Sequence, residues 1–398
     1  MTSPTMPQMF LIRQRFAADR LVDVTATLRA ELVRCPLGPG QQIAIAVGSR
    51  GIANLPAIVC GVAEWVRSQG SEPFIVPAMG SHAGATAAGQ QQLLEKFGIT
   101  SAPIRATMDV VPLGGNAFMD RLAYAADGVI VINRVKPHTS FHGQYESGLL
   151  KMLAVGLGKQ AGAAAIHRLG VPGLREEMPV VARQVLATGK IRLGIALVEN
   201  AYDETLVLEA IPAAMIPARE PALLDLARVS MPRLPVADVD VLVVDEIGKE
   251  FSGTGMDTNV IGRLRIDGEG EPASPRIKRI VVRDVRGESA YGIGLADVTT
   301  RRLVDRANWQ ITLTNVETSG FVERGKIPVV LETDAEAVAW ALPEGPRVLR
   351  IPNTLRLEWL LVSGSIRQEI AGRNTIEVLR PAPDFFAEWP TSSPPAPH

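Results

Sequence analysis

The residues best suited to chemistry in this chain are its histidines, because histidine titrates near neutral pH and is the commonest metal ligand. The chain of 398 residues has five of them, and one, His398, is its last residue. A lone histidine is more often a surface or hydrogen-bonded core residue than a catalytic one. Three of the other four, however, follow segments of strand-type sequence, where ligand sites form, so we expect a site that uses His82, His138, His142 and His167.

A lysine in an apolar segment, LLKML, stands between these histidines in the sequence. A buried ammonium group is costly, so Lys151 either extends to water along its aliphatic stem or has a shifted pKa. A neutral lysine amine can attach covalently to a carbonyl or thioacyl group. The small residues at 161–165, just before His167, would let a bulky ligand approach closely.

Strand-type runs alternate with helix-type runs, which predicts an α/β fold with mainly parallel sheets and flanking helices. The Gly-rich turns that follow the strands are the expected place for ligands. Strands are expected over Gln42–Val47, Pro73–Pro77, Gly128–Asn133 and Ile191–Glu199, with helices over Ala53–Gln69 and Thr86–Phe97.

The length of the chain exceeds what one core usually supports, so two domains are expected. The Pro-rich stretch at 230–237 is interpreted as the linker, and strand–helix alternation resumes at residue 238. We therefore predict an N-terminal cofactor-binding domain over 1–230, a C-terminal domain over 238–389 and a disordered Pro/Ser-rich tail over 390–398, with the active site in the interdomain cleft.

Composition excludes several classes of partner. Lys plus Arg total 41 and Asp plus Glu total 42, and aromatic residues make up 5%, so neither a basic surface nor a stacking platform for nucleic acid is indicated. The two cysteines, Cys35 and Cys60, predict no disulfide framework. Neither a secretory signal nor a membrane span is recognisable, and we expect a cytoplasmic protein.

The ordered set of motifs resembles the nickel-pincer nucleotide-dependent lactate racemase family, whose members are racemases or epimerases of 2-hydroxy acids. The resemblance extends over roughly residues 40 to 310 and includes two residues separated by sixteen positions, Lys151 and His167 (167 − 151 = 16). The other matching motifs are Ser49-Arg50, Gly80-Ser81-His82, Lys136-Pro137-His138, Gly248-Lys249 and Trp309-Gln310.

The resemblance implies a role for each matching residue. Lys151 would hold the cofactor, nickel pyridinium-3,5-bisthiocarboxylic acid mononucleotide, covalently through a thioamide, and His167 would complete the coordination of nickel. His82 and His138 would be the two acid/base residues. The remaining residues would bind the substrate carboxylate (Arg50, Lys249) or the cofactor (Ser49, Trp309). A 2-hydroxy acid would be the substrate, and cofactor-synthesis and delivery proteins would be partners.

Several alternatives stay open at this point. Val47 stands where the family has an acidic residue, which leaves room for a larger 2-hydroxy acid or a sugar acid as substrate. His142 could replace His138 as the second base. A second hypothesis is a zinc-type hydrolase or lyase that uses His82, His138 and His142, although no glutamate follows His138 as in an HExxH enzyme. A non-catalytic protein that binds a small acid is a third.

Overall fold

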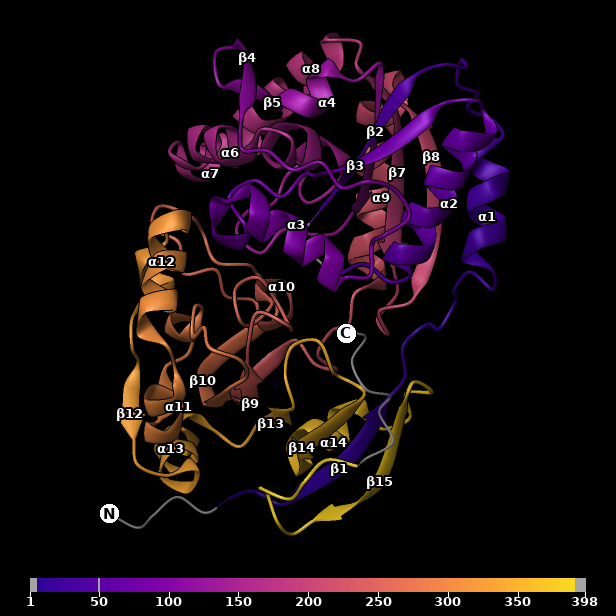
Figure 1. Ribbon diagram of the computed structural model, residues 1–398. Coiled ribbons are helices and arrows are strands. Elements are labelled where there is room, and N and C mark those ends of the chain that lie inside the picture. The colour runs from indigo at the N-terminus through magenta and orange to yellow at the C-terminus, as the bar shows by residue number, and fades with distance from the viewer. Residues whose placement is uncertain (1–5, 49–50, 391–398) are drawn as a thin grey trace. The chain divides into compact units, whose positions relative to one another are not determined.

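The structure is a computed structural model that describes residues 6–48 and 51–390. Among the described residues, the chain forms two compact units (Figure 1): the N-terminal unit lies within 18–231, and the C-terminal unit combines residues 6–17 with 232–390. The expected α/β class, with mainly parallel sheets and flanking helices, is confirmed.

The expected N-terminal domain over 1–230 is wrong at its beginning. Strand β1 (Met9–Gln14) pairs antiparallel with β14 (Trp359–Ser363) and with β15 (Ile376–Ala382) in the C-terminal unit. The partners of this strand lie at the far end of the chain, so no local pattern in the sequence indicates the pairing. The predicted tail over 390–398 lies outside the described residues except for Pro390.

The N-terminal unit is built on a five-stranded sheet in the order β3-β2-β6-β7-β8. The first four strands of this order are parallel to their neighbours, and β8 runs antiparallel to β7. The expected strands are confirmed with small shifts in their ends. Their bounds are β2 (Gln42–Val47), β3 (Glu72–Pro77), β6 (Gly128–Arg134) and β7 (Ile191–Glu199). The fifth strand, β8 (Thr205–Pro212), was not among the expected strands.

The central strands read as continuous apolar runs because helices or loops cover both faces of a parallel sheet. Ile43, Ile45 and Ile130 are fully buried there. The helices of the unit are α1 (Val24–Leu32), α2 (Leu55–Ser68), α3 (Ala87–Lys96), α4 (Arg121–Ala125), α5 (Leu149–Lys151), α6 (Lys159–His167), α7 (Gly170–Pro172), α8 (Met178–Ala187) and α9 (Ile216–Ser230). A π-helical segment, Met152–Gly156, follows α5, and a small hairpin is formed by β4 (Val110–Gly114) and β5 (Ala117–Asp120).

The C-terminal unit has an eight-stranded sheet in the order β12-β11-β10-β9-β13-β14-β1-β15. Its first five strands are parallel, and the last three are antiparallel. The strands not yet bounded are β9 (Asp238–Ile247), β10 (Arg276–Val285), β11 (Val298–Thr300), β12 (Val329–Leu331) and β13 (Val348–Ile351). The helices are α10 (Thr258–Ile261), α11 (Arg301–Arg306), α12 (Trp309–Ser319), α13 (Asp334–Ala341) and α14 (Gly364–Ile370).

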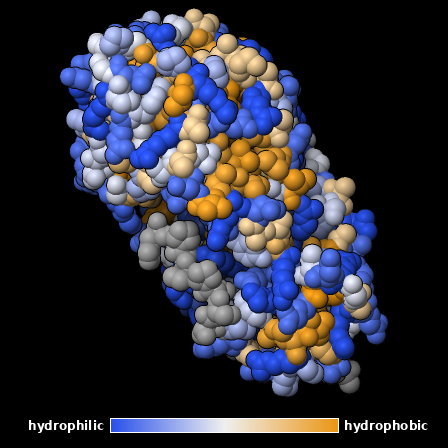
Figure 2. All heavy atoms as spheres, turned by 90° about the vertical axis from the view of Figure 1, so that its right-hand side faces the viewer, coloured by the Kyte–Doolittle hydropathy of each residue, from blue (hydrophilic) through white to orange (hydrophobic). Residues whose placement is uncertain are grey.

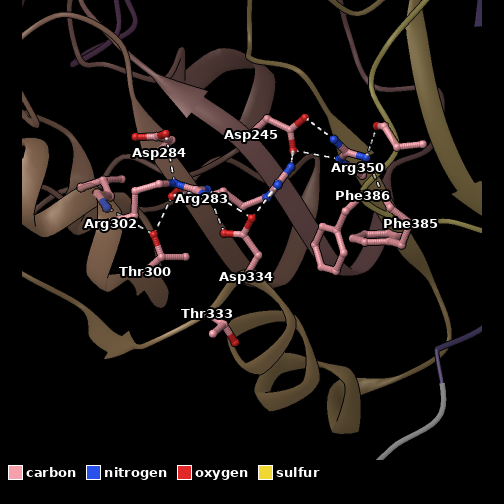
Figure 3. Close-up of polar contacts among 12 residues, drawn as sticks. Asp245, Arg283, Asp284, Thr300, Arg302, Thr333, Asp334, Arg350, Phe385 and Phe386 are labelled. Atoms are coloured by element: carbon pink, nitrogen blue, oxygen red, sulfur yellow. Dashed lines mark hydrogen bonds and ion pairs between the residues drawn. The ribbon is translucent and has the colours of Figure 1, made fainter.

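Ion pairs join the carboxyl ends of the parallel strands in the C-terminal unit (Figure 3). Arg283 on β10 lies between Asp245 on β9, at 2.8 Å, and Asp334 on α13, at 2.5 Å. Arg350 on β13 contacts both carboxylate oxygens of Asp245, at 2.8 and 2.7 Å. Trp389 also donates to Asp245, at 2.6 Å. Each buried charge in this cluster therefore has an opposite partner, which is the condition for burying it.

Apolar side chains at the surface do not by themselves indicate a site. Figure 2 shows hydrophobic patches interrupted by hydrophilic side chains on one face of the molecule. Exposed large apolar residues of the N-terminal unit include Val22, Val33 and Met215, a pattern common in globular proteins.

Within the described residues, no single helix meets the length and hydropathy expected of a membrane span. One pair of helical segments, Leu149–Gly156 and Lys159–His167, meets them together but is bent by 105°.

Candidate active site

The loop that follows β6 returns to the end of that strand and so brings two predicted site residues together. A pair of backbone hydrogen bonds between Lys136 and Ser147, at 2.8 and 3.2 Å, closes the loop. Asn133, near the end of β6, donates to the carbonyl oxygen of Gly148 at 2.7 Å. Helix α5 begins directly after this glycine, so His138 in the loop and Lys151 on the helix belong to one compact structure.

The carboxylate of Glu146 organises the interior of this loop. It is 1% exposed and accepts hydrogen bonds from the backbone N–H of His138, at 2.6 Å, and from Arg228, at 2.6 Å. His142 Nδ1 lies 3.3 Å from the same carboxylate. Burial raises the pKa of Glu146, but the hydrogen bonds from His142, His138 and Arg228 outweigh it and hold the pKa below its ordinary value. The carboxylate therefore stays ionised at neutral pH and fixes the loop around His138.

The side chains of His138 and Lys151 are in direct contact, with 2.6 Å between Nε2 and Nζ. The other ring nitrogen, Nδ1, accepts the backbone N–H of Ser140 at 3.0 Å. A neutral imidazole has one N–H, and Nδ1 is occupied as an acceptor, so the hydrogen-bond network assigns the proton to Nε2. This N–H then donates to Nζ, and an amine that accepts a hydrogen bond is uncharged. The geometry favours Lys151 as a neutral amine.

His167 is the last residue of α6 and is partly buried. Burial, and then the positive charge that Lys151 carries when protonated, lower the pKa of His167 to about 4. Burial is the larger cause, so the imidazole is neutral at pH 7 whichever form Lys151 takes. The influence of Lys151 on this pKa also means that the two side chains share one electrostatic neighbourhood. A neutral imidazole is the form that binds a metal ion.

The turn that carries His82 packs against the segment between Lys151 and His167. The backbone N–H of Gly80 donates to the carbonyl oxygen of Gly156 at 3.2 Å. A Cβ on Gly156 would lie 2.7 Å from the carbonyl oxygen of Ala78, so this close approach requires glycine. The third predicted histidine is thereby brought to the same end of the sheet.

A buried polar network holds the His82 turn in place. Gln90 on α3 donates to the carbonyl oxygens of Gly80, at 3.0 Å, and His82, at 3.3 Å. Lys159 is fully buried and donates to Gln90 Oε1 at 3.2 Å, with an ion pair to Asp120 at 2.9 Å. Burial lowers the pKa of Lys159, while Asp120 opposes that shift. The network fixes the turn through the backbone carbonyl oxygens of Gly80 and His82.

The other predicted site residues lie outside the described residues or in the C-terminal unit. Ser49 and Arg50 lie outside the described residues. Lys249 belongs to the C-terminal unit, where its ammonium donates to the carbonyl oxygen of Gly253 at 2.8 Å and lies 4.6 Å from the centroid of the Tyr291 ring. Trp309 begins α12 of the same unit and donates to the carbonyl oxygen of Val304 at 3.0 Å. Their binding roles stay predictions.

A zinc site formed by His82, His138 and His142 is contradicted. Over residues 6–48 and 51–390, no group of three or more His, Cys, Asp or Glu side chains could hold a metal ion. His138 contacts Lys151, whereas His142, with its side chain 45% exposed, contacts Glu146. The spacing of two histidines in a loop does not determine where their side chains point. The sequence could therefore suggest a zinc site that the described residues do not form.

Sequence reasoning missed Glu146, Lys159 and Glu220, three buried charged residues around the site. A signal existed for the last of them. Glu220 occupies an apolar position of α9, on the face that also carries Ile216, Leu223 and Leu224. A charged residue in an apolar stripe is a candidate for a buried functional or structural role.

The fold and site together define an α/β protein with a nitrogen-rich site, one amine and two or more imidazoles, beyond the carboxyl ends of a parallel sheet. No protein-family model matches the chain, and no curated protein matches it. Among solved structures, the chain is similar to the lactate racemase apoprotein from Thermoanaerobacterium thermosaccharolyticum. The identity is 11%, the TM-score is 0.48, and the alignment covers 86% of this chain and 94% of that chain. Function therefore has to be inferred from the residues of the site.

Proposed function

We propose that the protein is a racemase or epimerase that inverts C2 of a 2-hydroxy acid, with a nickel-pincer nucleotide tethered to Lys151. The observation that carries the proposal is the contact of 2.6 Å between Lys151 Nζ and His138 Nε2, with Nδ1 engaged by Ser140. This arrangement supports an uncharged, nucleophilic amine at the position that the family resemblance assigns to the cofactor.

The residues present fit the group that the proposal requires. A thioamide link needs a neutral amine, which Lys151 supplies. Nickel accepts imidazole nitrogen, and the low pKa of His167, about 4, keeps its ring lone pair available at neutral pH. The close packing of Gly80 on Gly156 keeps the backbone compact around both residues. Lys151 and His167 would thus hold the group.

Abstraction of the α-proton of a hydroxy acid is difficult because that proton is very weakly acidic. Acceptance and return of the C2 hydrogen as a hydride is the chemistry that the nickel group supplies when bound. The residues of the chain are left with proton movement at the hydroxyl oxygen: one imidazole takes the hydroxyl proton as the keto acid forms, and an imidazole returns a proton afterwards. We assign these roles to His82 and His138, since inversion benefits from a base on each side of the carbon.

His138 is preferred over His142 as the second base. Its imidazole lies beside Lys151, whereas His142 contacts Glu146, which is a structural carboxylate of the loop. Arg50 and Lys249 are proposed to bind the substrate carboxylate and neighbouring oxygens, and Ser49 and Trp309 to contribute to cofactor binding. The substrate is proposed as lactate or a larger 2-hydroxy acid, including sugar acids. The cofactor-synthesis and delivery proteins and the cytoplasmic location also stay proposals.

The test is intact-mass spectrometry with metal analysis after co-expression with cofactor-synthesis enzymes. We expect a covalent adduct on the unchanged chain with about one nickel per chain, and loss of both in Lys151→Arg. Lys190→Arg is the matched control, because Lys190 contacts the Ala126 carbonyl oxygen and the Tyr124 ring instead of the site. His167→Ala should keep the adduct and lose nickel.

Two results would overturn the proposal. An adduct that persists in Lys151→Arg would place the attachment elsewhere, and an unchanged chain without adduct or nickel would favour a non-catalytic protein that binds a small acid. A racemisation screen over 2-hydroxy acids with the loaded protein then identifies the substrate. His82→Gln and His138→Gln should each lower the rate by at least about a hundredfold if both imidazoles act as acid/base residues.

A further inference from the structure

One helix, α9, supports the candidate site at three separate points. Tyr145 donates from its hydroxyl to the carbonyl oxygen of Pro217 at 2.9 Å. Arg228 donates to Glu146 at 2.6 Å. Between these two contacts, the carboxylate of Glu220 accepts the backbone N–H of Leu150 at 3.0 Å. The loop that carries His138 and the helix that carries Lys151 are therefore fixed by the same element.

The carboxyl group of Glu220 fills the space at the beginning of α5. The residue is 1% exposed, and its Oε1 has no hydrogen-bond partner among the described residues. A Cβ on Gly148 would lie 2.5 Å from that oxygen, so a larger residue at this position would have to displace the carboxyl group. An acidic group at a helix N-terminus accepts N–H groups that the helix cannot pair internally.

The protonation of Glu220 changes near neutral pH. Burial raises its pKa to about 7, although hydrogen bonds from the backbone N–H groups of Leu150 and Leu149 act in the opposite direction. No charged side chain is among the causes of this shift. The charged and titratable groups on the elements packed around it are Lys151 on α5, Tyr145 and Glu146 in the loop, Arg192 and Glu199 on β7, Glu209 on β8, and Arg219, Asp225 and Arg228 on α9.

We propose that Glu220 is a positioning residue for Lys151, which it acts on by fixing the first turn of α5 through the Leu150 amide. The relevance of this role to catalysis rests on the proposed function; the positioning itself does not. Lys151 is the next residue after Leu150, so loosening of this turn moves the Nζ that contacts His138. The carboxyl group accepts the backbone N–H of Leu150, so its effect on Lys151 is transmitted through the backbone.

Hydrogen–deuterium exchange of the cofactor-free chain tests the proposal. Three variants are compared with the unchanged chain: Glu220→Ala removes the acceptor, Glu220→Gln keeps an acceptor without a charge, and Glu209→Gln is the control carboxylate on β8. We expect exchange at 148–152 to increase about tenfold in Glu220→Ala, the effect of leaving the buried Leu150 amide without its hydrogen-bond acceptor. Glu220→Gln should restore slow exchange, and peptides from β2 and β6 should not change in any variant.

A pH series adds a readout that mere packing would not affect. The ratio of exchange rates, unchanged chain over Glu220→Gln, is taken at each pH so that intrinsic exchange cancels. Opening exposes Glu220 to water, where its pKa is lower, so the closed turn is favoured at low pH and loses that advantage as pH rises toward 7. The ratio should rise by at least about tenfold between pH 5.5 and 8. The corresponding ratio, unchanged chain over the Glu209→Gln control, should not change with pH.

The outcomes are decisive in both directions. Exchange at 148–152 that is the same in Glu220→Ala and the unchanged chain overturns the proposal, as does an increase that extends equally to β2 and β6. A ratio that does not vary with pH assigns Glu220 a purely steric role and also overturns it. None of these measurements needs the cofactor, so failure here is separate from failure of the adduct experiment on Lys151.

Discussion

Lys151 is expected to react with aldehydes in the cofactor-free chain far faster than an ordinary lysine at neutral pH. Its Nζ lies 2.6 Å from His138 Nε2, and the hydrogen bond that Ser140 donates to Nδ1 assigns the imidazole proton to Nε2. An ordinary lysine, with a pKa of about 10.4, is unprotonated about one-thousandth of the time at pH 7.5. An amine that is fully unprotonated at this pH would therefore react up to about a thousandfold faster than an ordinary lysine.

The assay uses pyridoxal 5′-phosphate followed by borohydride. The amine adds to the aldehyde and loses water to form an imine, which borohydride reduces to a stable secondary amine that peptide mass spectrometry locates. The rate at Lys151 is compared with that at Lys96, an exposed lysine in the last turn of α3. We expect an excess of at least about a hundredfold at pH 7.5, shrinking toward pH 10 as ordinary lysines lose their protons.

Two histidine variants identify the origin of this reactivity. His138→Phe keeps a ring packed against Phe141, whose centroid is 4.6 Å from that of His138, but removes the Nε2 donor. We expect the Lys151 rate in this variant to fall to that of Lys96. His142→Phe is the control, because His142 contacts Glu146, and it should leave the rate unchanged. Equal rates for Lys151 and Lys96 in the unchanged chain, or a Lys151 rate that His138→Phe does not alter, would refute the proton assignment.

Three further predictions concern stability. Lys159→Met should lower the free energy of unfolding by about 3–5 kcal/mol in urea titrations, because it leaves the carboxylate of Asp120 buried without its partner at 2.9 Å; a loss below 1 kcal/mol would contradict this role. Glu220→Gln should gain stability relative to the unchanged chain as pH rises from about 4.5 to 7, by up to about 3 kcal/mol. The reason is that burial raises the pKa of Glu220 to about 7, so the group favours the folded state only while it is protonated. Free energies of unfolding that differ by the same amount at every pH in this range would count against the prediction. Asp245→Asn should destabilise the C-terminal unit by about 3 kcal/mol or more, because Arg283 and Arg350 lose their shared carboxylate; unaltered unfolding of that unit, followed by hydrogen exchange, would show that the pairs contribute little.

Much of the N-terminal unit could be predicted from the sequence. Strands β2, β3, β6 and β7 were expected within one or two residues of their observed ends, because continuous apolar runs between turn residues are a local property of the chain. The placement of His82 and His138 at one end of the sheet also follows from the sequence once the strands are taken as parallel. Both residues come after the carboxyl ends of strands of that sheet, β3 and β6.

Other features of the site depend on pairings that no local pattern encodes. Lys159 reaches Gln90 across 69 residues, and Glu220 reaches Leu150 across 70. Strand β1 joins a sheet whose other strands all come from the second half of the chain. These partners are selected by burial, since a buried charge or an unpaired strand edge is stable only where the folded chain supplies a partner.

The sequence by itself determined which residue types were available for the site and in which order they follow the strands. Only the tertiary structure decided their chemical states. His138 and His142 are both histidines of one short loop, yet the first contacts Lys151 and the second contacts Glu146. The reason is physical: the proton of an imidazole and the charge of an amine depend on the donors and acceptors around them, and those neighbours exist only after the loop has closed on β6 and α9.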